Sequence, residues 1–420
     1  MLQTVDVDIA PLSEYAALMS PERLAALEDL AAALRGLRVA HVSATPYGGG
    51  VSELLRSVVP LYRGLGLHAV WHVIPGDERF FAVTKGFHNA LQGAPYQLTA
   101  AARETYLMYN THNAQLMEGD YDAVFIHDPQ PLALRAFVEG GGAVWIWRCH
   151  IDTSEPNAAV LEFLTPFAES YDAVVFTLES FIPRAWRHLP VTAMPPGIDP
   201  LSPKNMPLPP EVAQRIVRWL GVDPHRPILT QVSRFDPWKD PLGVIGVYRA
   251  VRERVPGLQL ALLGSMALDD PEGWDLYHTI VDECRGDPDI HVATNITGVS
   301  NIEVNAFQSC SDVVIQKSIR EGFGLVVSET LWKGTPVVAG NTGGIPLQMP
   351  PGTGGFLVDD PAEYERRIHD LLTDRDLARD LAERGQRHVQ EHFLVTRLVE
   401  DELRLLHRLV AGHTTAQHPA

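Results

Sequence analysis

The chain has 420 residues, of which 45% are hydrophobic and 20% charged, a composition typical of globular protein and a length that favours two domains. Its 52 acidic residues outnumber its 34 basic residues, which gives a formal net charge of −18. This negative charge repels phosphate backbones and anionic lipids, and so argues against binding to nucleic acid or to an anionic membrane surface. Three widely spaced cysteines, Cys149, Cys284 and Cys310, predict neither a disulfide framework nor a paired metal-ligand motif.

The apolar runs and the start of the chain bear on its location. The longest apolar stretches, such as residues 143–147 and 260–263, fall far short of the roughly 20 residues of a membrane span. The first ten residues contain Asp6 and Asp8 and do not resemble a secretion signal. We therefore expect a cytoplasmic protein.

The first half of the chain alternates between strand-like and helical stretches. After an alanine-rich opening that predicts a helix, residues 37–43 form a β-branched run, and residues 51–62 have the spacing of an amphipathic helix that Pro60 is expected to kink or end. Further strands are expected at residues 68–74, 122–127, 143–148 and 172–177, with helices at residues 131–138 and 158–168. This alternation predicts a parallel sheet with helices on both faces.

A proline-rich stretch around residue 200 interrupts the pattern and indicates a linker between domains 1–200 and 201–395. The alternation then restarts, with strands expected at residues 228–233, 258–263, 290–293, 312–316 and 336–339. Residues 360–411 are continuously helical with a break at 392–395, so that a last helix, 396–420, could pack back on the first domain. The sequence thus predicts an α/β protein of two Rossmann-like, doubly wound domains that face a ligand-binding cleft.

The segment from Arg320 to Glu329 is the most informative motif. It follows an expected strand and opens a helix whose free N–H groups and positive dipole end favour a phosphate. Glu321 and Glu329 could bind hydroxyls on either side of that phosphate, although two glutamates near a helix start can also simply face water. The candidate donor-binding residues here are Gly322, Phe323, Gly324, Leu325 and Glu329.

A pair of cations follows the first expected strand of the second domain. Arg234 and Lys239 flank the turn at Asp236, where both could reach a diphosphate leaving group and neutralise its charge. The alternative is a surface basic pair that caps Asp240. A glycosidase would instead need two carboxyl groups at acid and nucleophile positions.

Two first-domain segments also lie at expected strand ends. Gly49 and Gly50 belong to a glycine run that starts at Gly48 and could bind a ligand through its amides, or form a plain tight turn. The run lacks a dinucleotide fingerprint and the Lys-Ser/Thr of a P-loop. His150 and Asp152 could reach sugar hydroxyls, although a histidine so placed can also be structural. With His127 and Asp128 they form no zinc-like ligand cluster, so no metal site is predicted.

These motifs resemble the retaining glycosyltransferases of the glycogen-synthase-like and sucrose-synthase-like superfamily, whose fold is of the GT-B type. The resemblance implies that Arg234 and Lys239 bind the donor diphosphate, Glu321 the transferred sugar and Glu329 the nucleotide ribose. The candidate catalytic residues are Arg234, Lys239, Glu321 and His150.

The first domain is similar to the trehalose glycosyltransferring synthases within that superfamily, through residues 43–51, 76–93, 150–152 and 198–205. This resemblance implies reversible transfer of glucose from a nucleoside diphosphate to free glucose, giving α,α-trehalose. It also implies a set of acceptor-side candidates: Asp77, Glu78, Lys85, His88, Asn89 and Asp152. The expected partners are small-molecule substrates and, by family resemblance, a second copy in a homodimer. No tightly bound cofactor is expected, and nothing in the sequence predicts Mg²⁺.

Several alternatives remain open at this point. A retaining trehalose phosphorylase would place phosphate where the nucleotide sits, although Glu329 would then have no ribose to hold. A related glucosyltransferase could use another acceptor, such as fructose or a sugar phosphate. A non-catalytic sugar-nucleotide sensor, against which the cation pair and the glutamate pair argue, and a nucleotide-sugar epimerase of the same fold are further alternatives.

Overall fold

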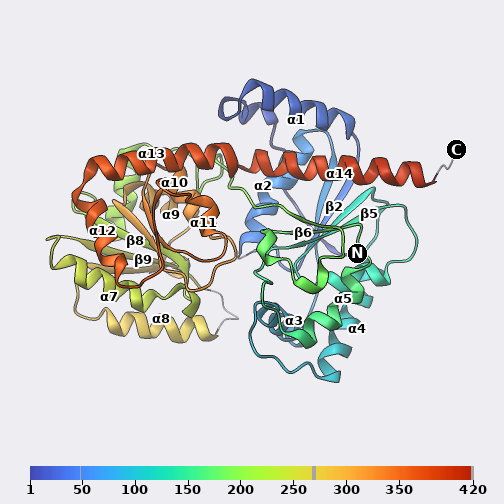
Figure 1. The fold of residues 1–420 in the computed structure, drawn as a ribbon, viewed down its shortest axis with the longest axis horizontal. Helices are drawn as coiled ribbons and strands as arrows, with labels where there is room; N and C mark the ends of the chain where they lie inside the picture. Colours follow the sequence, from blue (N-terminus) through green and yellow to red (C-terminus); the bar gives the residue numbers. More distant parts are fainter. Residues whose placement is uncertain (48, 267–270, 418–420) are drawn as a thin grey trace. The chain divides into compact units, whose positions relative to one another are not determined.

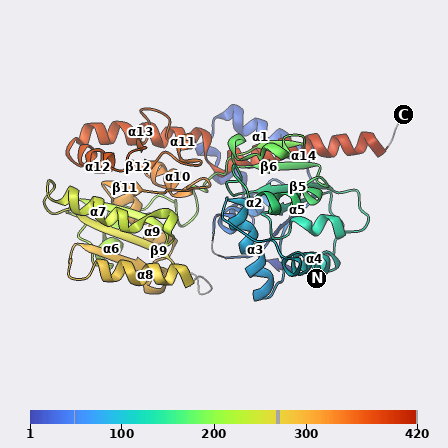
Figure 2. The same cartoon turned by 60° about the horizontal axis from the view of Figure 1, so that its bottom comes forward.

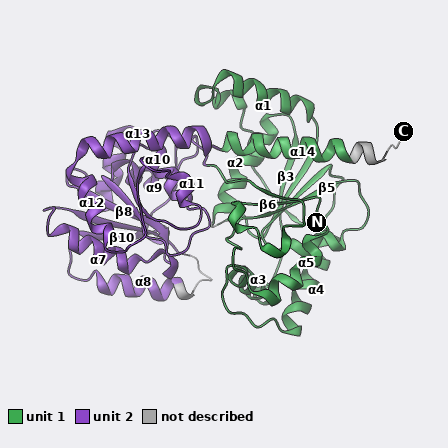
Figure 3. Ribbon diagram, viewed as in Figure 1, with its two compact units in different colours: residues 1–197, 395–420 green, residues 198–394 purple. Residues whose placement is uncertain are grey.

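The structure is a computed structural model that describes residues 1–47, 49–266 and 271–417. Gly48, the first glycine of the predicted loop, lies outside the described residues. The chain forms two compact units, unit 1 from Met1–Gly197 and Val395–Ala420 and unit 2 from Ile198–Leu394 (Figure 3). Among the described residues, no helix is both long enough and apolar enough to cross a membrane.

Unit 1 is built on a sheet with the strand order β1-β3-β2-β4-β5-β6-β7. All neighbouring strands are parallel except β1, which pairs antiparallel to β3. The strands are β1 Gln3–Val5, β2 Arg38–Ser43, β3 His68–Val73, β4 Ala123–His127, β5 Val144–Cys149, β6 Ala173–Phe176 and β7 Val191–Ala193. Its α-helices are α1 Pro21–Ala33, α2 Gly50–Gly64, α3 Glu78–Leu91, α4 Ala100–Leu116, α5 Ala158–Ala168 and α14 Val395–Gln417.

The two faces of the unit 1 sheet differ in chemistry. One face contacts an apolar core that α3, α4 and α5 cover. Its strand residues include Ala40, Val42, Val124, Ile126 and Trp147. The alternate positions carry polar side chains that are also buried, namely His41, His127 and Arg148. Since side chains alternate across a strand, the polar residues share the face opposite that core. Buried polar groups need partners, and on this face His127 binds His41 while Glu402 binds Arg148.

The alanine-rich opening contains the predicted helix, α1, although the chain begins with the short strand β1, which adds to the free edge of β3. Two local expectations for unit 1 were wrong. Helix α2 continues through Pro60 to Gly64, since its apolar face, from Leu54 to Tyr62, is buried and outweighs the lost hydrogen bond. Residues 131–138 form the 3₁₀ segment η3 (Leu132–Phe137) in place of an α-helix. The other 3₁₀ segments of unit 1 are η1 Leu12–Glu14, η2 Ala16–Leu18, η4 Glu179–Phe181 and η5 Arg184–Trp186.

Unit 2 contains a parallel sheet with the order β10-β9-β8-β11-β12-β13, and helices flank it on both sides (Figure 2). The strands are β8 Ile228–Arg234, β9 Gln259–Ser265, β10 Ile290–Thr294, β11 Val313–Gln316, β12 Val337–Gly340 and β13 Gly355–Val358. The α-helices are α6 Pro210–Trp219, α7 Pro241–Arg252, α8 Pro271–Glu283, α9 Asn301–Cys310, α10 Leu325–Trp332, α11 Ile345–Gln348, α12 Glu363–Thr373 and α13 Arg375–His392. The 3₁₀ segments are η6 Pro237–Lys239 and η7 Asn295–Thr297.

The strands of unit 2 are apolar on both faces, as a parallel sheet between two helical layers requires. Along β9, Leu260 and Leu262 contact the core beneath α7, α8 and α12, while Ala261 and Leu263 contact the core beneath α6 and α9. The helical stretch after residue 360 breaks at Asp374 as well as near residue 393, because Asp374 caps α13 by accepting from the N–H of Leu377 at 2.9 Å.

The last helix, α14, packs against α1, α2 and β5 of unit 1 (Figure 1). Its Glu402 forms a hydrogen-bonded ion pair with Arg148 of β5, and the two side chains are only 1% and 2% exposed. Tyr62 of α2 donates to the other oxygen of Glu402 at 2.9 Å. Burial raises the pKa of Glu402, and the charge of Arg148 opposes that shift. The buried pair therefore links the end of the chain to the polar face of the first sheet.

Replacing Glu402 by Ala should lower the free energy of unfolding by about 3–5 kcal/mol, because the guanidinium of Arg148 would remain buried without its counter-charge. Urea unfolding measures the effect. Arg404→Ala is the matched control, since Arg404 lies on the same helix with its side chain 54% exposed, and its partner Glu400 keeps a second ion pair with Arg23. That control should change stability by less than about 1 kcal/mol. Equal losses in the two variants would contradict the assigned role of the buried pair.

Candidate functional site

Glu321 and Lys239 meet at the carboxyl edge of the unit 2 sheet. Lys239, at the end of η6, donates to Glu321 Oε2 at 2.6 Å, and both side chains are largely buried. The same oxygen accepts from Ser318 Oγ at 3.1 Å and from Gln316 Nε2 at 3.2 Å. None of the hydrogen bonds found among the described residues uses Oε1 of Glu321. That oxygen can therefore bind a ligand without breaking the cluster.

The backbone of residues 321–323 is held by the loop before α11. A side-chain carbon on Gly343 would come within 1.7 Å of the Glu321 carbonyl oxygen, and one on Gly344 would come within 2.8 Å of Phe323 Cα. Gly343 also has a φ of +56°, which favours glycine. Only glycine allows the two loops to come this close, so Gly343 and Gly344 belong to the site. In the sequence, a lone Gly-Gly is too weak a signal to predict this role.

Helix α10 begins beside this cluster. Its N-cap, Gly324, has a φ of +79°, and Val327 N–H donates back to the Gly324 carbonyl at 2.9 Å. The N–H groups of the first turn, at Leu325 and Val326, have no backbone partner inside the helix. Gly322 and Phe323 lie directly before this helix start. The Phe323 ring is buried, and its centroid lies 5.5 Å from that of the Phe393 ring. The helix start is thus suited to an anion.

Arg234, the second predicted cation, ends β8 and is 59% exposed, with Asp236 Oδ2 at 3.3 Å from its guanidinium. Asp240, which follows η6, adopts a left-handed conformation and caps α7 by accepting from the N–H of Gly243. Lys317, which the sequence analysis did not single out, forms an ion pair with Asp240. Arg234 is therefore the cation of this group with the greatest freedom to move toward a ligand.

Glu329 is 2% exposed and fully engaged by protein groups. Lys204 Nζ lies 3.0 Å from its Oε1, and Gln308 Nε2 lies 3.4 Å from its Oε2. Lys333 donates to the Glu329 carbonyl at 2.9 Å, and burial lowers the pKa of Lys333 to about 7. Sequence reasoning missed Lys204, because it lies more than a hundred residues from its partner.

At the carboxyl edge of unit 1, the predicted glycine loop leads into α2. Gly49 has a φ of +127° and accepts from Ser52 Oγ at 3.0 Å through its carbonyl, and Gly50 is the first residue of the helix. Among the described residues, no atom other than those of the adjoining chain residues lies within 4 Å of the position that a side chain on Gly49 would occupy. This side of Gly49 therefore has room for a ligand.

His150 follows β5 beside Asp128, which ends β4. The backbone N–H of His150 donates to Asp128 Oδ1 at 2.9 Å. Asp128 has a φ of +63°, rare for a residue with a side chain, and its N–H and carbonyl are bound by the Arg148 carbonyl and the Trp147 indole. Strain held by this many contacts is common at functional sites. From the sequence, Asp128 was a candidate only as a metal ligand.

Burial raises the pKa of Asp128 to about 7, and the His150 N–H and the charge of Arg148 oppose the shift. Because the unfolded value is near 3.9, the folded protein binds an extra proton between about pH 4 and pH 7. Its stabilising contribution is complete below pH 4 and disappears as the pH rises through 7.

Asp128→Asn removes this titration while keeping an oxygen that can accept from His150 and a residue that tolerates positive φ. The variant should gain stability over the parent as the pH rises from 4 to 7, by at most about 1.4 kcal/mol per pH unit, and by less because Asp128 is partly exposed. Urea unfolding at a series of pH values measures the difference. A difference that does not vary with pH would refute the raised pKa.

The acceptor-side candidates gather on α3 and after β5. Asp77 caps α3 by accepting from the Phe80 N–H at 3.0 Å, and this bond, with Tyr109 and Arg79, lowers the pKa of Asp77 to about 2. Glu78, Lys85 and Asn89 are exposed along the helix, and His88 Nδ1 lies 3.1 Å from Gln92 Nε2. Asp152 accepts from the Ser154 N–H at 2.9 Å. The start of α3 and the end of β5 belong to the same sheet edge, since β3 and β5 are both parallel to the strands between them.

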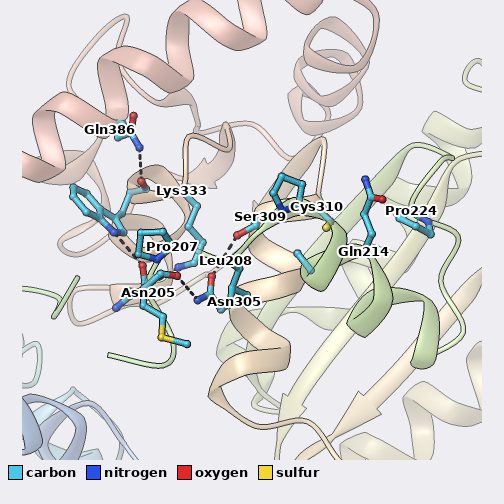
Figure 4. Close-up of a pocket in the computed structure, with 14 residues that line it drawn as sticks. Asn205, Pro207, Leu208, Gln214, Pro224, Asn305, Ser309, Cys310, Lys333 and Gln386 are labelled. Atoms are coloured by element: carbon cyan, nitrogen blue, oxygen red, sulfur yellow. Dashed lines mark hydrogen bonds between the residues drawn. The ribbon is translucent and has the colours of Figure 1, made fainter. Parts of the chain in front are cut away.

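A cavity of about 520 Å³ lies elsewhere in unit 2 (Figure 4). Its walls come from the segment after residue 204 and from α6, α9, α10 and α13. Asn205 accepts from Lys333 Nζ at 2.9 Å and from the Trp332 indole at 3.2 Å, and Gln386 donates to the Trp332 carbonyl at 2.7 Å. The predicted site residues do not line this cavity. Among the described residues, no group of three His, Cys, Asp or Glu side chains could hold a metal ion.

Comparison with known proteins identifies the family. Residues 41–183 match the model of the trehalose synthase N-terminal domain, and residues 214–388 match that of glycosyl transferases group 1. A trehalose synthase of Rubrobacter xylanophilus is 52% identical over 98% of this chain and 100% of that protein, and one of Pyrococcus horikoshii is 44% identical over 95% and 96%. The chain belongs to the trehalose synthase family of glycosyltransferases.

More distant relatives agree with this assignment. A trehalose phosphorylase of Pleurotus pulmonarius is 28% identical over 91% of this chain and 59% of its own length. A sucrose-phosphate synthase structure from Thermosynechococcus elongatus shares the fold, with a TM-score of 0.70 at 17% identity, covering 90% of this chain and 100% of that one. The predicted fold class, two parallel α/β domains of the GT-B type, is therefore confirmed.

In an enzyme of the trehalose synthase family, the carboxyl edge of each sheet is a candidate binding surface. The unit 2 edge carries Lys239, Glu321 and the α10 start, and the unit 1 edge carries the glycine turn, Asp128 and His150. Ligands of open α/β sheets bind beyond the carboxyl ends of the strands, and both groups lie there. The enzyme therefore carries out glycosyl transfer related to trehalose, with these two edges as its candidate binding surfaces.

Proposed function

We propose that the protein is a retaining glucosyltransferase that converts a nucleoside diphosphate glucose and free glucose reversibly into α,α-trehalose and the nucleoside diphosphate. The observation that carries the proposal is the contact of 2.6 Å between Lys239 and Glu321 beside the start of α10. In this cluster, the cation and the helix N-terminus suit the negative diphosphate of a nucleotide sugar, and the carboxylate suits its sugar hydroxyls.

In this proposal the donor diphosphate binds at the α10 start, with Arg234 turning inward and Lys239 bound to the leaving phosphate. Glu321 binds hydroxyls of the transferred glucose through Oε1, while the Lys239, Ser318 and Gln316 contacts hold Oε2. The acceptor hydroxyl attacks from the face that the diphosphate leaves. Its proton passes to the departing phosphate oxygen, so no metal ion or tightly bound cofactor is required.

The acceptor side of the proposal lies in unit 1. His150 binds a sugar hydroxyl from the end of β5, with Asp152 beside it, and the amides of Gly49 and Gly50 bind the donor phosphate. The polar residues of α3 contribute to the acceptor subsite: Asp77, Glu78, Lys85, His88 and Asn89. Asp77 is ionised at neutral pH because its pKa is about 2, so it can accept a hydrogen bond from a hydroxyl.

A retaining trehalose phosphorylase is the second candidate, because a relative with that name spans most of the chain. The sequence analysis took Glu329 as evidence against it, on the ground that a phosphorylase has no ribose to bind. The ion pair with Lys204 gives Glu329 a structural role in either enzyme. The choice between the two activities therefore depends on the co-substrate and not on this residue.

Incubation of the protein with glucose and each of several nucleoside diphosphate glucoses should yield a non-reducing disaccharide that trehalase cleaves. Released nucleoside diphosphate should equal the disaccharide in amount. A parallel reaction with α-glucose 1-phosphate in place of the nucleotide sugar is the control for the phosphorylase. Product in that reaction alone would overturn the proposal, and transfer to fructose or a sugar phosphate alone would overturn the acceptor.

Lys239→Met should reduce kcat about 10²–10³-fold, because the developing charge on the leaving phosphate loses a preorganised cation. Steady-state assays with saturating donor measure this loss. Arg375→Ala is the control: Arg375 pairs with Asp312, at the start of β11 and opposite the proposed site, so its loss removes a unit 2 ion pair without touching the donor. Turnover within about threefold of the parent for Lys239→Met would remove this residue from the leaving-group role.

A further inference from the structure

Three histidine rings stand in a line behind the carboxyl edge of the unit 1 sheet. Nδ1 of His41 lies 3.1 Å from Nε2 of His127, and Nδ1 of His127 lies 2.9 Å from Nε2 of His150. The rings are stacked, with centroids 5.4 Å and 5.3 Å apart. His41 is on β2, His127 ends β4 and His150 follows β5, so each strand supplies one ring. Neighbouring rings therefore share one proton at each contact.

The three rings are neutral. Burial and the charge of Arg148 lower the pKa of each ring, that of His41 to about 3. A neutral imidazole has one donor nitrogen and one acceptor nitrogen. The two successive hydrogen bonds therefore require the same tautomer in all three rings. Either every ring carries its proton on Nδ1, or every ring carries it on Nε2.

His41, at the buried end of the line, decides between these two tautomers. His41 Nε2 is buried and has no hydrogen-bond partner among the described residues, where the ring stacks on Phe125 and meets the Tyr62 ring edge-on. With protons on Nε2, this atom would be a buried donor without an acceptor. With protons on Nδ1, it is a bare lone pair, and unpaired acceptors are tolerated in protein interiors better than unpaired donors.

We propose that His41 and His127 are positioning residues that fix His150 in its Nδ1–H form, so that it presents a hydrogen-bond donor to a sugar hydroxyl. None of the hydrogen bonds found among the described residues uses Nδ1 of His150, and the Asp128 contact fixes its backbone. The tautomer follows from the line of rings alone, and only the identity of the sugar rests on the proposed function. The line ends at His41, so it orients His150 and does not conduct protons.

The ring nitrogen resonances of ¹⁵N-histidine-labelled protein test the tautomer without any substrate. His41, His127 and His150 should each show a protonated Nδ1 and an unprotonated Nε2 at neutral pH, whereas free neutral histidine prefers the proton on Nε2. Single substitutions assign the three signals. A protonated Nε2 on His150 in the parent protein would overturn the proposal, whether or not the enzyme makes trehalose.

His127→Phe keeps a stacked ring but removes both hydrogen bonds, so His150 should shift toward the Nε2–H form. The kcat/KM for transfer should fall about tenfold, the value of one lost hydrogen bond. His72→Phe is the matched control, because His72 lies on β3 of the same sheet and bonds Thr4 and Tyr121 instead. It should leave the His150 resonances unchanged. Unchanged His150 resonances in the folded His127→Phe protein would also overturn the proposal.

Discussion

A parallel sheet covered on both faces has no exposed face on which to place chemistry. In unit 2, neighbouring positions along β9 are buried in two separate apolar cores, so polar side chains that act on a ligand must follow the strands. Lys239, Glu321 and the start of α10 all lie beyond strand ends, as do the glycine turn, Asp128 and His150 in unit 1. The location of the candidate site is thus a consequence of how the sheets are buried.

Unit 1 departs from this rule on one face, and the departure has a cost that the structure offsets. His41, His127 and Arg148 point inward from adjacent strands, where unpaired polar groups would be expensive. Glu402 neutralises and binds Arg148, Tyr62 donates to the other oxygen of Glu402, and the histidines bind one another. The final helix therefore does more than cover apolar surface, since it supplies the counter-charge for Arg148 on β5, the strand that His150 follows. Burial lowers the pKa of each of these histidines, and the charge of Arg148 lowers it further.

Buried charge also connects the carboxyl edge of the unit 2 sheet to the interior of that unit. Glu321 keeps one oxygen for protein contacts and leaves the other for a ligand, whereas both oxygens of Glu329 have protein partners. Two glutamates eight positions apart thus occupy different environments, although both sit near one helix start. Gly343 and Gly344 permit the close backbone approach that holds Glu321, and their role depends on a contact between separate loops.

The sequence by itself determined the alternation of strands and helices, the parallel α/β class and the strand ends at which the site residues lie, because periodicity and glycine turns are local signals. It also carried the family, through motifs that match over most of the chain. Tertiary structure decided the course of α2 through Pro60, the antiparallel β1, the Lys204–Glu329 pair and the line of three histidines. These features depend on burial and on contacts between residues far apart in the chain, and no local pattern records them.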